Sequence, residues 1–257
     1  MLRILAISNQ KGGVGKTTTS INLAASLVMA GRRVLLVDID PQGNATMGSG
    51  IDKRSLRATV YQVLLGSAPM SSVRVRSQSG GYDLIPANRE LAGAEVEMVE
   101  LAERETRLKT ALEGIKAQYD YILIDCPPAL NLLTVNGLCA ANAVMIPMQC
   151  EYYALEGLSD LVQTIKKVRV KLNPALEIEG LLRTMYDPRN MLSQQVSDQL
   201  QQHFGDKVYR TVIPRNVRLA EAPSFGKPIM HYDGWSKGAR SYKALAKEVE
   251  RRAGGKR

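Results

Sequence analysis

The sequence predicts an α/β protein built on a mainly parallel, twisted β-sheet with helices on both faces. Short, almost continuously apolar runs recur along the chain, and most are separated by segments with the 3.6-residue periodicity of an amphipathic helix. Strands that are apolar throughout are typical of parallel sheets, in which helices cover both faces. The 257 residues contain no Pro-, Gly- or Ser-rich linker, so we expect a single domain over 1–257.

The expected elements alternate along the chain. The apolar runs predict strands at 2–7, 33–38, 82–85, 121–125, 143–147, 178–185 and 208–213. Amphipathic periodicity predicts helices at 17–30, 56–65, 94–117, 132–140, 155–170, 193–203 and about 236–252. Ligands of open parallel sheets bind at the carboxyl ends of the strands, so the residues that follow each strand are the candidates for a site.

The first strand-to-helix turn reads K-G-G-V-G-K-T-T, and its members are Lys11, Gly12, Gly13, Val14, Gly15, Lys16, Thr17 and Thr18. Glycines allow consecutive backbone N–H groups to converge on a phosphate at the positive end of the helix dipole. Lys16 can neutralise the outer phosphates, and Thr17 can offer its hydroxyl to Mg²⁺. The turn therefore predicts a site for a nucleoside triphosphate.

The phosphate loop departs from the standard pattern, because Gln10 stands where a glycine is usual and a second lysine, Lys11, stands at the mouth of the loop. This form resembles the signature of the ParA/MinD family of P-loop ATPases. The resemblance implies that the nucleotide is ATP and that Lys11 reaches across a homodimer to the partner's nucleotide. Lys11 and Lys16 are accordingly expected to take part in catalysis.

Two more strand ends carry carboxylates. The segment V-L-L-V-D-I-D-P-Q-G-N at 34–44 places Asp38 and Asp40 on the same face of a strand. It resembles the switch I region of ParA-type proteins, which implies that Asp40 positions or activates the attacking water and that Asp38 lies near Mg²⁺ or its waters. The segment Y-I-L-I-D-C-P-P at 121–128 brings Asp125 to the phosphate loop in a Walker B arrangement, where it would orient the waters of Mg²⁺.

The segment I-P-R-N at 213–216 follows the last expected strand. It resembles the base-binding strip of the family, which implies that Pro214 packs on the adenine and that Asn216 hydrogen-bonds its edge. The next residues, V-R-L-A-E-A-P-S-F-G-K-P, match the ParA/Soj branch concerned with chromosome segregation. The resemblance extends from Leu2 to about Arg251.

The net charge of +9 is confined to the end of the chain, where thirteen basic and four acidic residues follow Asp206. Lysines and arginines on loops and helix faces contact phosphates without reading bases, so this excess predicts non-specific, salt-sensitive binding to double-stranded DNA. The candidate contacts, to which Arg189 is added from outside that region, are Arg189, Arg218, Lys227, Lys237, Arg240, Lys243 and Lys247.

The predicted function is that of a weak, dimerising ATPase of the ParA/Soj type that partitions a chromosome or plasmid. The resemblance implies that an ATP-sandwich dimer binds DNA and that a ParB-type partner stimulates hydrolysis and release. No stretch approaches the roughly 18 to 20 apolar residues that span a bilayer, so we expect a cytoplasmic protein without stable membrane association. The resemblance implies that it associates with the nucleoid.

Two alternatives fit the sequence less well. A MinD-like membrane-cycling ATPase needs a terminal amphipathic helix with bulky apolar anchors, and residues 242–252 offer few of them. An iron-sulfur reductase subunit that shares the same loop needs two cluster-ligating cysteines in its central region, and Cys126, Cys139 and Cys150 do not reproduce the positions of that family.

Overall fold

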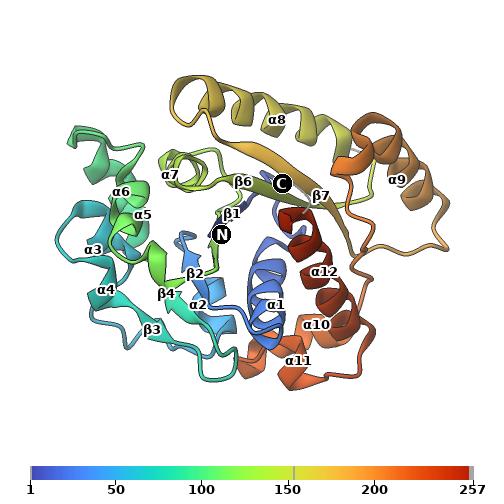
Figure 1. The fold of residues 1–257 in the computed structure, drawn as a ribbon, viewed down its shortest axis with the longest axis horizontal. Coiled ribbons are helices and arrows are strands. Elements are labelled where there is room, and N and C mark those ends of the chain that lie inside the picture. Colours follow the sequence, from blue (N-terminus) through green and yellow to red (C-terminus); the bar gives the residue numbers. More distant parts are fainter. Residues whose placement is uncertain (1, 153, 255–257) are drawn as a thin grey trace.

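A seven-stranded sheet forms the centre of the protein, in the order β3-β4-β2-β5-β1-β6-β7 (Figure 1). The computed structural model describes residues 2–152 and 154–254, so Lys256 and Arg257 of the basic end lie outside the described residues. The strands are β1 Arg3–Ile7, β2 Val34–Asp38, β3 Val75–Arg76, β4 Asp83–Ile85, β5 Tyr121–Asp125, β6 Ala143–Gln149 and β7 Glu177–Thr184. Every neighbouring pair is parallel except β3 with β4. The predicted fold class is confirmed.

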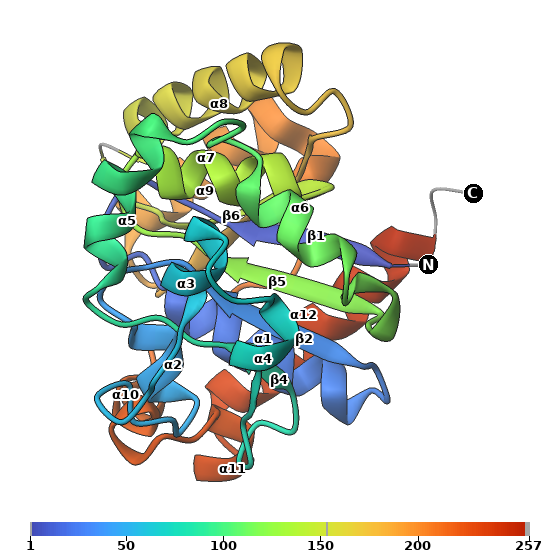
Figure 2. The same cartoon turned by 90° about the vertical axis from the view of Figure 1, so that its left-hand side faces the viewer.

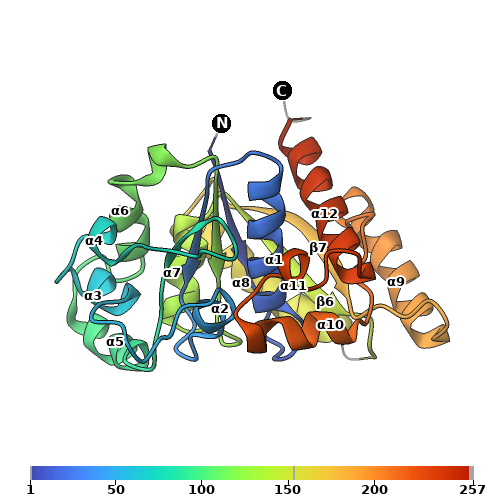
Figure 3. The ribbon, with the colours of Figure 1, turned by 90° about the horizontal axis from the view of Figure 1, so that it is seen from below.

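Helices cover both faces of this sheet. They are α1 Lys16–Met29, α2 Asn44–Gly48, α3 Val60–Leu65, α4 Met70–Val73, α5 Leu91–Glu97, α6 Arg107–Glu113, α7 Leu132–Ala140, α8 Ala154–Lys171, α9 Met191–Phe204, α10 Val217–Glu221, α11 Ile229–Tyr232 and α12 Lys237–Gly254, with 3₁₀ turns η1 Met98–Glu100, η2 Lys116–Gln118, η3 Gly205–Lys207 and η4 Ala222–Phe225. Because successive strand residues point to opposite faces, Ile4 and Ala6 join one apolar core, and Leu5 and Ile7 join the other. The first core packs under α3 to α9, and the second under α1 and α10 to α12 (Figures 2 and 3).

The segment 94–117 was predicted as one helix, and this prediction was wrong. The chain forms α5, η1 and α6 there, and Glu103 between them has a left-handed backbone with φ of 52°. Leu91 of α5 and Leu108 of α6 are both fully buried in the same core. Because the chain reverses between the two short helices, both can pack on that core, whereas a single long helix would extend beyond it. Tertiary packing therefore overrides the helical periodicity of the local sequence.

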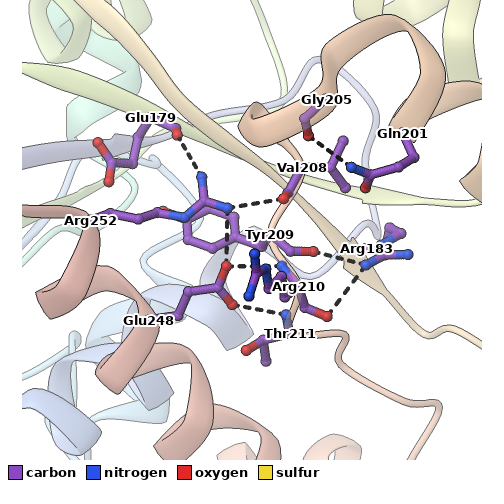
Figure 4. A network of polar contacts seen from close by, with 10 residues as sticks. All are labelled: Glu179, Arg183, Gln201, Gly205, Val208, Tyr209, Arg210, Thr211, Glu248 and Arg252. Atoms are coloured by element: carbon purple, nitrogen blue, oxygen red, sulfur yellow. Dashed lines mark hydrogen bonds and ion pairs between the residues drawn. The ribbon is translucent and has the colours of Figure 1, made fainter. Parts of the chain in front are cut away.

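The segment 208–213 was predicted as a strand, and it is not one. It touches β7 through the isolated bridge of Val208 with Leu181, and the Tyr209 amide donates to the Leu181 carbonyl at 3.0 Å. Side chains bond several of its backbone groups (Figure 4): Glu248 accepts from the amides of Arg210 and Thr211, both at 2.9 Å, and Arg183 donates to the Tyr209 carbonyl at 2.8 Å. The segment is extended and its backbone forms hydrogen bonds, but these bonds do not form a continuous β-ladder with β7.

These contacts anchor the C-terminal helix α12 to the body of the protein. Glu248 and Arg252 of α12 pair at 3.0 Å, and Glu248 is only 4 % exposed. Arg252 donates to the Val208 carbonyl at 2.9 Å and lies over the ring of Tyr209, 4.0 Å from its centroid. Charge-assisted bonds of this kind, shielded from water, are stronger than exposed ones. Helix α12 is therefore fixed to the segment that leads to Pro214 and Asn216.

We predict that Glu248→Gln lowers the free energy of unfolding at neutral pH by about 1–3 kcal/mol, because the variant removes a buried charge that accepts three hydrogen bonds. Burial raises the pKa of Glu248, but bonds from Thr211, Arg210 and Arg252 outweigh it and bring the pKa below its ordinary value of 4.5. A lowered folded pKa stabilises the protein above about pH 4.5, and this stabilisation disappears as the pH falls through the folded value. Urea unfolding at pH 7 and at pH 3.5 measures both effects.

The matched control is Glu250→Gln, which removes a carboxylate two residues away that pairs with the exposed Arg32. Surface pairs contribute little, so this variant should change the unfolding free energy much less. The difference between Glu248→Gln and the unmodified protein should shrink at the acidic pH. An equal loss of unfolding free energy at both pH values would show that Glu248 stabilises the protein through its packing rather than through its charge.

Candidate nucleotide-binding site

The loop between β1 and α1 has the backbone geometry of a phosphate cradle. Gly13 and Gly15 have φ of 75° and 87°, in the left-handed region where a β-carbon would be strained. Gly15 is also the N-cap of α1, and no side chain among the described residues caps this end of the helix. The first N–H groups of α1 are thus directed out of the helix without a protein partner, as an anion site requires.

Neighbouring strand ends hold this loop in place. The Thr184 hydroxyl, at the end of β7, donates to the Val14 carbonyl at 2.8 Å. The Asn9 amide donates to the Pro147 carbonyl of β6 at 2.8 Å, and its oxygen accepts from the Lys11 amide at 3.0 Å. The loop is therefore preorganised by β6 and β7 before any ligand arrives. The sequence motif alone did not identify Asn9 and Thr184.

Lys16 occupies the centre of the loop. It is 7 % exposed, and its ammonium donates to the Lys11 carbonyl at 3.1 Å. Burial lowers the pKa of Lys16, while Asp125 and Asp40 oppose this change by favouring the charged form. Both acidic candidates therefore lie close enough to Lys16 to influence its charge.

A hydroxyl and a carboxylate meet next to Lys16. The Thr17 hydroxyl donates to one oxygen of Asp125 at 2.8 Å, and the Ser20 hydroxyl donates to the other, also at 2.8 Å. Thr17 and Asp125 are hard oxygen ligands of the kind that Mg²⁺ prefers, usually with waters completing the octahedron. Ser20 is a residue that the sequence reasoning missed. It lies one helical turn after Lys16, and only its spacing from that residue could have pointed to it.

Asp38 and Asp125 are fully buried and lie side by side, as register partners of β2 and β5. Burial raises the pKa of both carboxyl groups, and their mutual repulsion adds to the effect at Asp125. A bound cation relieves the repulsion between two neighbouring carboxylates. The residues present therefore fit a divalent metal ion beside the phosphate loop.

Asp38 and Asp40 have different surroundings. Asp38 accepts from the amide and the hydroxyl of Thr46, at 2.8 and 2.7 Å, and from the Asp40 amide at 3.1 Å. It thus holds the turn between β2 and α2 in shape, with Thr46 as a partner that the sequence did not reveal. Asp40 is 7 % exposed and accepts from the Gln42 amide at 2.9 Å. That Asp40 positions water and that Asp38 lies near the metal stay predictions.

The second lysine of the loop is paired within its own chain. The Lys11 ammonium lies 2.5 Å from a carboxylate oxygen of Glu151, which follows β6, and the two side chains are 45 % and 48 % exposed. Sequence spacing gave no sign of this pair, since 140 residues separate its members. An exposed pair is weak and easily exchanged. Lys11 must therefore leave Glu151 before its ammonium can contact a phosphate group.

A cavity of about 150 Å³ opens beside the phosphate loop. Its lining includes Gly13 and Thr18 of the loop, Met185 after β7, and the predicted base-contacting residues Pro214 and Asn216. Asn216 caps α10, since its oxygen accepts from the Leu219 amide at 3.2 Å, and its NH₂ group has no partner among the described residues. Met185 has a left-handed backbone with φ of 48°, a strained conformation for a non-glycine residue and one that often marks functional sites.

The candidate DNA contacts fall into two groups. Lys237, Arg240, Lys243 and Lys247 lie at helical spacing on α12, opposite its buried face. Together with Lys227 they have no ion-pair partner in the described part of the chain. Arg218 pairs with Glu221 at 2.9 Å, and Arg189 pairs with Asp187 at 2.8 Å on the loop before α9. The charge of these two arginines is already partly balanced.

The three cysteines are buried on separate segments, after β5, within α7 and after β6. Burial raises the pKa of the Cys139 and Cys150 thiols to about 11 and that of Cys126 further, which disfavours the thiolate that metals bind. Within 2–152 and 154–254 no group of three or more His, Cys, Asp or Glu residues is arranged to hold a metal ion.

Comparison with known proteins shows the family to which the chain belongs. A family model described as an AAA domain matches residues 2–178. The chain is 57 % identical to the sporulation initiation inhibitor protein Soj of Bacillus subtilis, over 97 % of this chain and 98 % of that protein. It is 56 % identical to the chromosome partitioning protein ParA of Caulobacter vibrioides, over 96 % and 94 %. A solved structure of cobyrinic acid a,c-diamide synthase from Mycobacterium smegmatis, with a bound ATP analogue and magnesium, is 40 % identical, with a TM-score of 0.88 and coverage of 100 % and 98 %.

A glycine loop at a helix N-terminus, a buried lysine and a paired threonine and aspartate define a P-loop ATPase. More narrowly, the chain belongs to the ParA/Soj family of partitioning ATPases.

Proposed function

We propose that this protein is an ATP-dependent DNA-partitioning ATPase whose ATP-bound dimer binds DNA without sequence preference. The observation that carries the proposal is the path of helix α1. Its N-terminus is the phosphate site, and its flank packs against α12, whose outward face carries the unpaired cations. The hydroxyls of Thr19 in α1 and Tyr242 in α12 lie 3.2 Å apart in the buried contact. One helix therefore supports both the phosphate loop and the basic surface of a subunit.

ATP would bind with its phosphates on the loop 11–18 and its adenine in the cavity beside Pro214 and Asn216. Thr17 and Asp125 would hold Mg²⁺, which supplies charge neutralisation of the phosphates when bound. Asp40, at the edge of the same site, would orient the attacking water. Lys11 would leave Glu151 and contact the partner subunit's nucleotide, so that the site is complete only in the dimer. Hydrolysis to ADP and phosphate would then separate the subunits.

Turnover should be slow in the absence of a partner protein, since a switch needs a long-lived ATP state. We propose that a ParB-type protein completes the hydrolytic geometry and that the ATPase works in the cytoplasm at the nucleoid. The identity to proteins named for chromosome partitioning, at 54–56 %, exceeds the 40 % to the named synthase and supports a partitioning role.

A membrane-cycling role is less well supported. Tyr242, Leu245 and Val249 form the apolar face of α12, and all three are buried against the second core. A helix that binds a bilayer needs such a face to be free. None of the helices in the described part of the chain has the length and apolar content that a bilayer span requires.

Charge reversal at Lys227, Lys237 or Arg240 tests the DNA-binding part of the proposal. Each variant should weaken binding to any duplex and reduce the slope of log affinity against log salt by roughly 0.9 for each DNA phosphate that the variant no longer neutralises. ATP binding and dimerisation should survive, since the three residues lie away from the phosphate loop. The measurement is a DNA titration at several salt concentrations with a non-hydrolysable ATP analogue.

The control is charge reversal at Lys109 on α6, an exposed lysine on the other face of the sheet. It should leave affinity and slope unchanged. The proposal fails if the variants of the basic surface retain the affinity and slope of the unmodified protein. It fails equally if the protein binds DNA as well without nucleotide as with it.

A further inference from the structure

Trp235 is the single tryptophan of the sequence and is 91 % exposed. It lies in the turn between α11 and α12, and this turn is well held: Ser236 donates through its hydroxyl to the Asp233 carbonyl at 2.8 Å and accepts from the Ala239 amide at 3.2 Å. The backbone is thus fixed while the indole projects into solvent. Aromatic residues exposed to this degree are typical of interaction surfaces, where they become buried.

The surroundings of Trp235 are basic and partly aromatic. Lys237 and Arg240 begin α12 directly after it, and Lys227 precedes α11. Phe225, which is 62 % exposed, stacks on Tyr232 with ring centroids 4.9 Å apart. Helix α11 packs against both η4 and α12, so the segments that carry these residues are neighbours in the fold.

The charges around Trp235 indicate which partner it meets. Lys227, Lys237 and Arg240 have no ion-pair partner within the described residues, and a polyanion would supply one. A lipid surface fits less well, because the apolar face of α12 is already buried. Apolar side chains flanked by cations are used by DNA-binding proteins to contact the minor groove, in some cases as wedges between base steps.

We propose that Trp235 contacts duplex DNA and adds an apolar component to the ionic contacts of Lys227, Lys237 and Arg240. The inference rests on the DNA binding proposed above and assigns a second kind of contact to that surface. Lysine contacts release counterions and therefore weaken with salt. An indole that packs against sugars and base edges releases none, so its contribution is nearly independent of salt.

The two kinds of contact can be separated by the salt dependence of binding. Trp235→Ala should lower affinity for a random duplex roughly tenfold at every salt concentration, without a change in slope. Trp235→Phe should retain most of the affinity. The matched control, Lys237→Ala, should lower the slope by roughly 0.9 for each DNA phosphate that it no longer neutralises. Titrations use a non-hydrolysable ATP analogue, and nucleotide binding by each variant is measured in parallel.

Fluorescence gives a direct readout, since excitation that is selective for tryptophan reports on Trp235 alone. Its intensity and wavelength should change when DNA is added with the ATP analogue. Unchanged emission on saturation with DNA, or unchanged affinity in Trp235→Ala, would overturn the proposal. A reduced salt slope in Trp235→Ala would also overturn it, since the indole would then act through neighbouring cations.

Two further outcomes separate this inference from the proposed function. An emission change on vesicles of anionic phospholipid, with none on DNA, would assign Trp235 to a membrane and overturn its contact with DNA. If the unmodified protein with the ATP analogue binds no DNA at all, both the proposed function and the contact of Trp235 fall. DNA binding that is unaffected by Trp235→Ala overturns the contact alone.

Discussion

Replacement of Lys16 by alanine should abolish tight ATP binding. Lys16 is the buried cation of the phosphate loop, 7 % exposed and bonded to the Lys11 carbonyl. Without it, the outer phosphates of ATP would lie beside Asp125 and Asp40 and would lose the buried ammonium of their own subunit. We expect affinity to fall at least a hundredfold, which corresponds to about 2.8 kcal/mol. Nucleotide titration calorimetry measures this loss, and light scattering with ATP should detect no dimer.

Thermal unfolding without nucleotide distinguishes a loss of binding from a loss of structure, because Lys16→Ala should still unfold cooperatively. Lys109→Ala removes an exposed lysine on α6 and serves as the control for a change in net charge. It should bind ATP as the unmodified protein does. Unchanged ATP affinity in Lys16→Ala would remove the loop 11–18 from the nucleotide site.

Replacement of Asp40 by alanine should have the opposite effect on the dimer. If Asp40 orients the attacking water and contributes little to the bound ground state, Asp40→Ala still binds ATP while hydrolysis falls roughly a hundredfold to ten-thousandfold. The ATP-bound dimer would then accumulate. Size-exclusion chromatography with ATP should show a persistent dimer, and phosphate release should show almost no turnover.

Asp40→Asn separates the chemical role from a structural one. Asparagine can still accept the hydrogen bond from the Gln42 amide, which Asp40 receives at 2.9 Å, but it carries no negative charge. If Asp40 only shapes the turn, Asp40→Asn should restore hydrolysis; if it acts on the water, Asp40→Asn should be as slow as Asp40→Ala. Normal turnover by Asp40→Ala would remove Asp40 from the mechanism.

Local patterns were sufficient for the parts of the site that lie within one segment. The phosphate loop needs glycines, a lysine and a hydroxyl in a fixed order between a strand and a helix, and all of them are adjacent in sequence. Strand β5 was predicted with its observed limits, because Asp120 precedes this short run and two prolines follow soon after Asp125. Register between parallel strands then brought Asp38 and Asp125 together, as expected from carboxylates at neighbouring strand ends.

Contacts between distant segments were not predictable in the same way. The pairing of Lys11 with Glu151 and the bond between Thr184 and Val14 depend on the tertiary arrangement of β1, β6 and β7. The segment 208–213 has the composition of a strand, yet side chains of β7 and α12 take the backbone bonds that a neighbouring strand would have made. A local pattern records propensity, whereas these features depend on which groups the fold brings within reach.

The anchoring of α12 has a consequence for how affinity for DNA is regulated. Glu248 and Arg252 tie this helix to the chain just before Pro214, and Tyr242 ties it to α1, so one subunit presents its cations on a stiff support whether or not nucleotide is bound. Such a support has little freedom to reshape its own surface in response to ATP. The increase in affinity for DNA that ATP causes must then come from avidity. Two weakly binding surfaces, joined in a dimer, contact one duplex at high effective concentration, and both dissociate from it when the subunits separate.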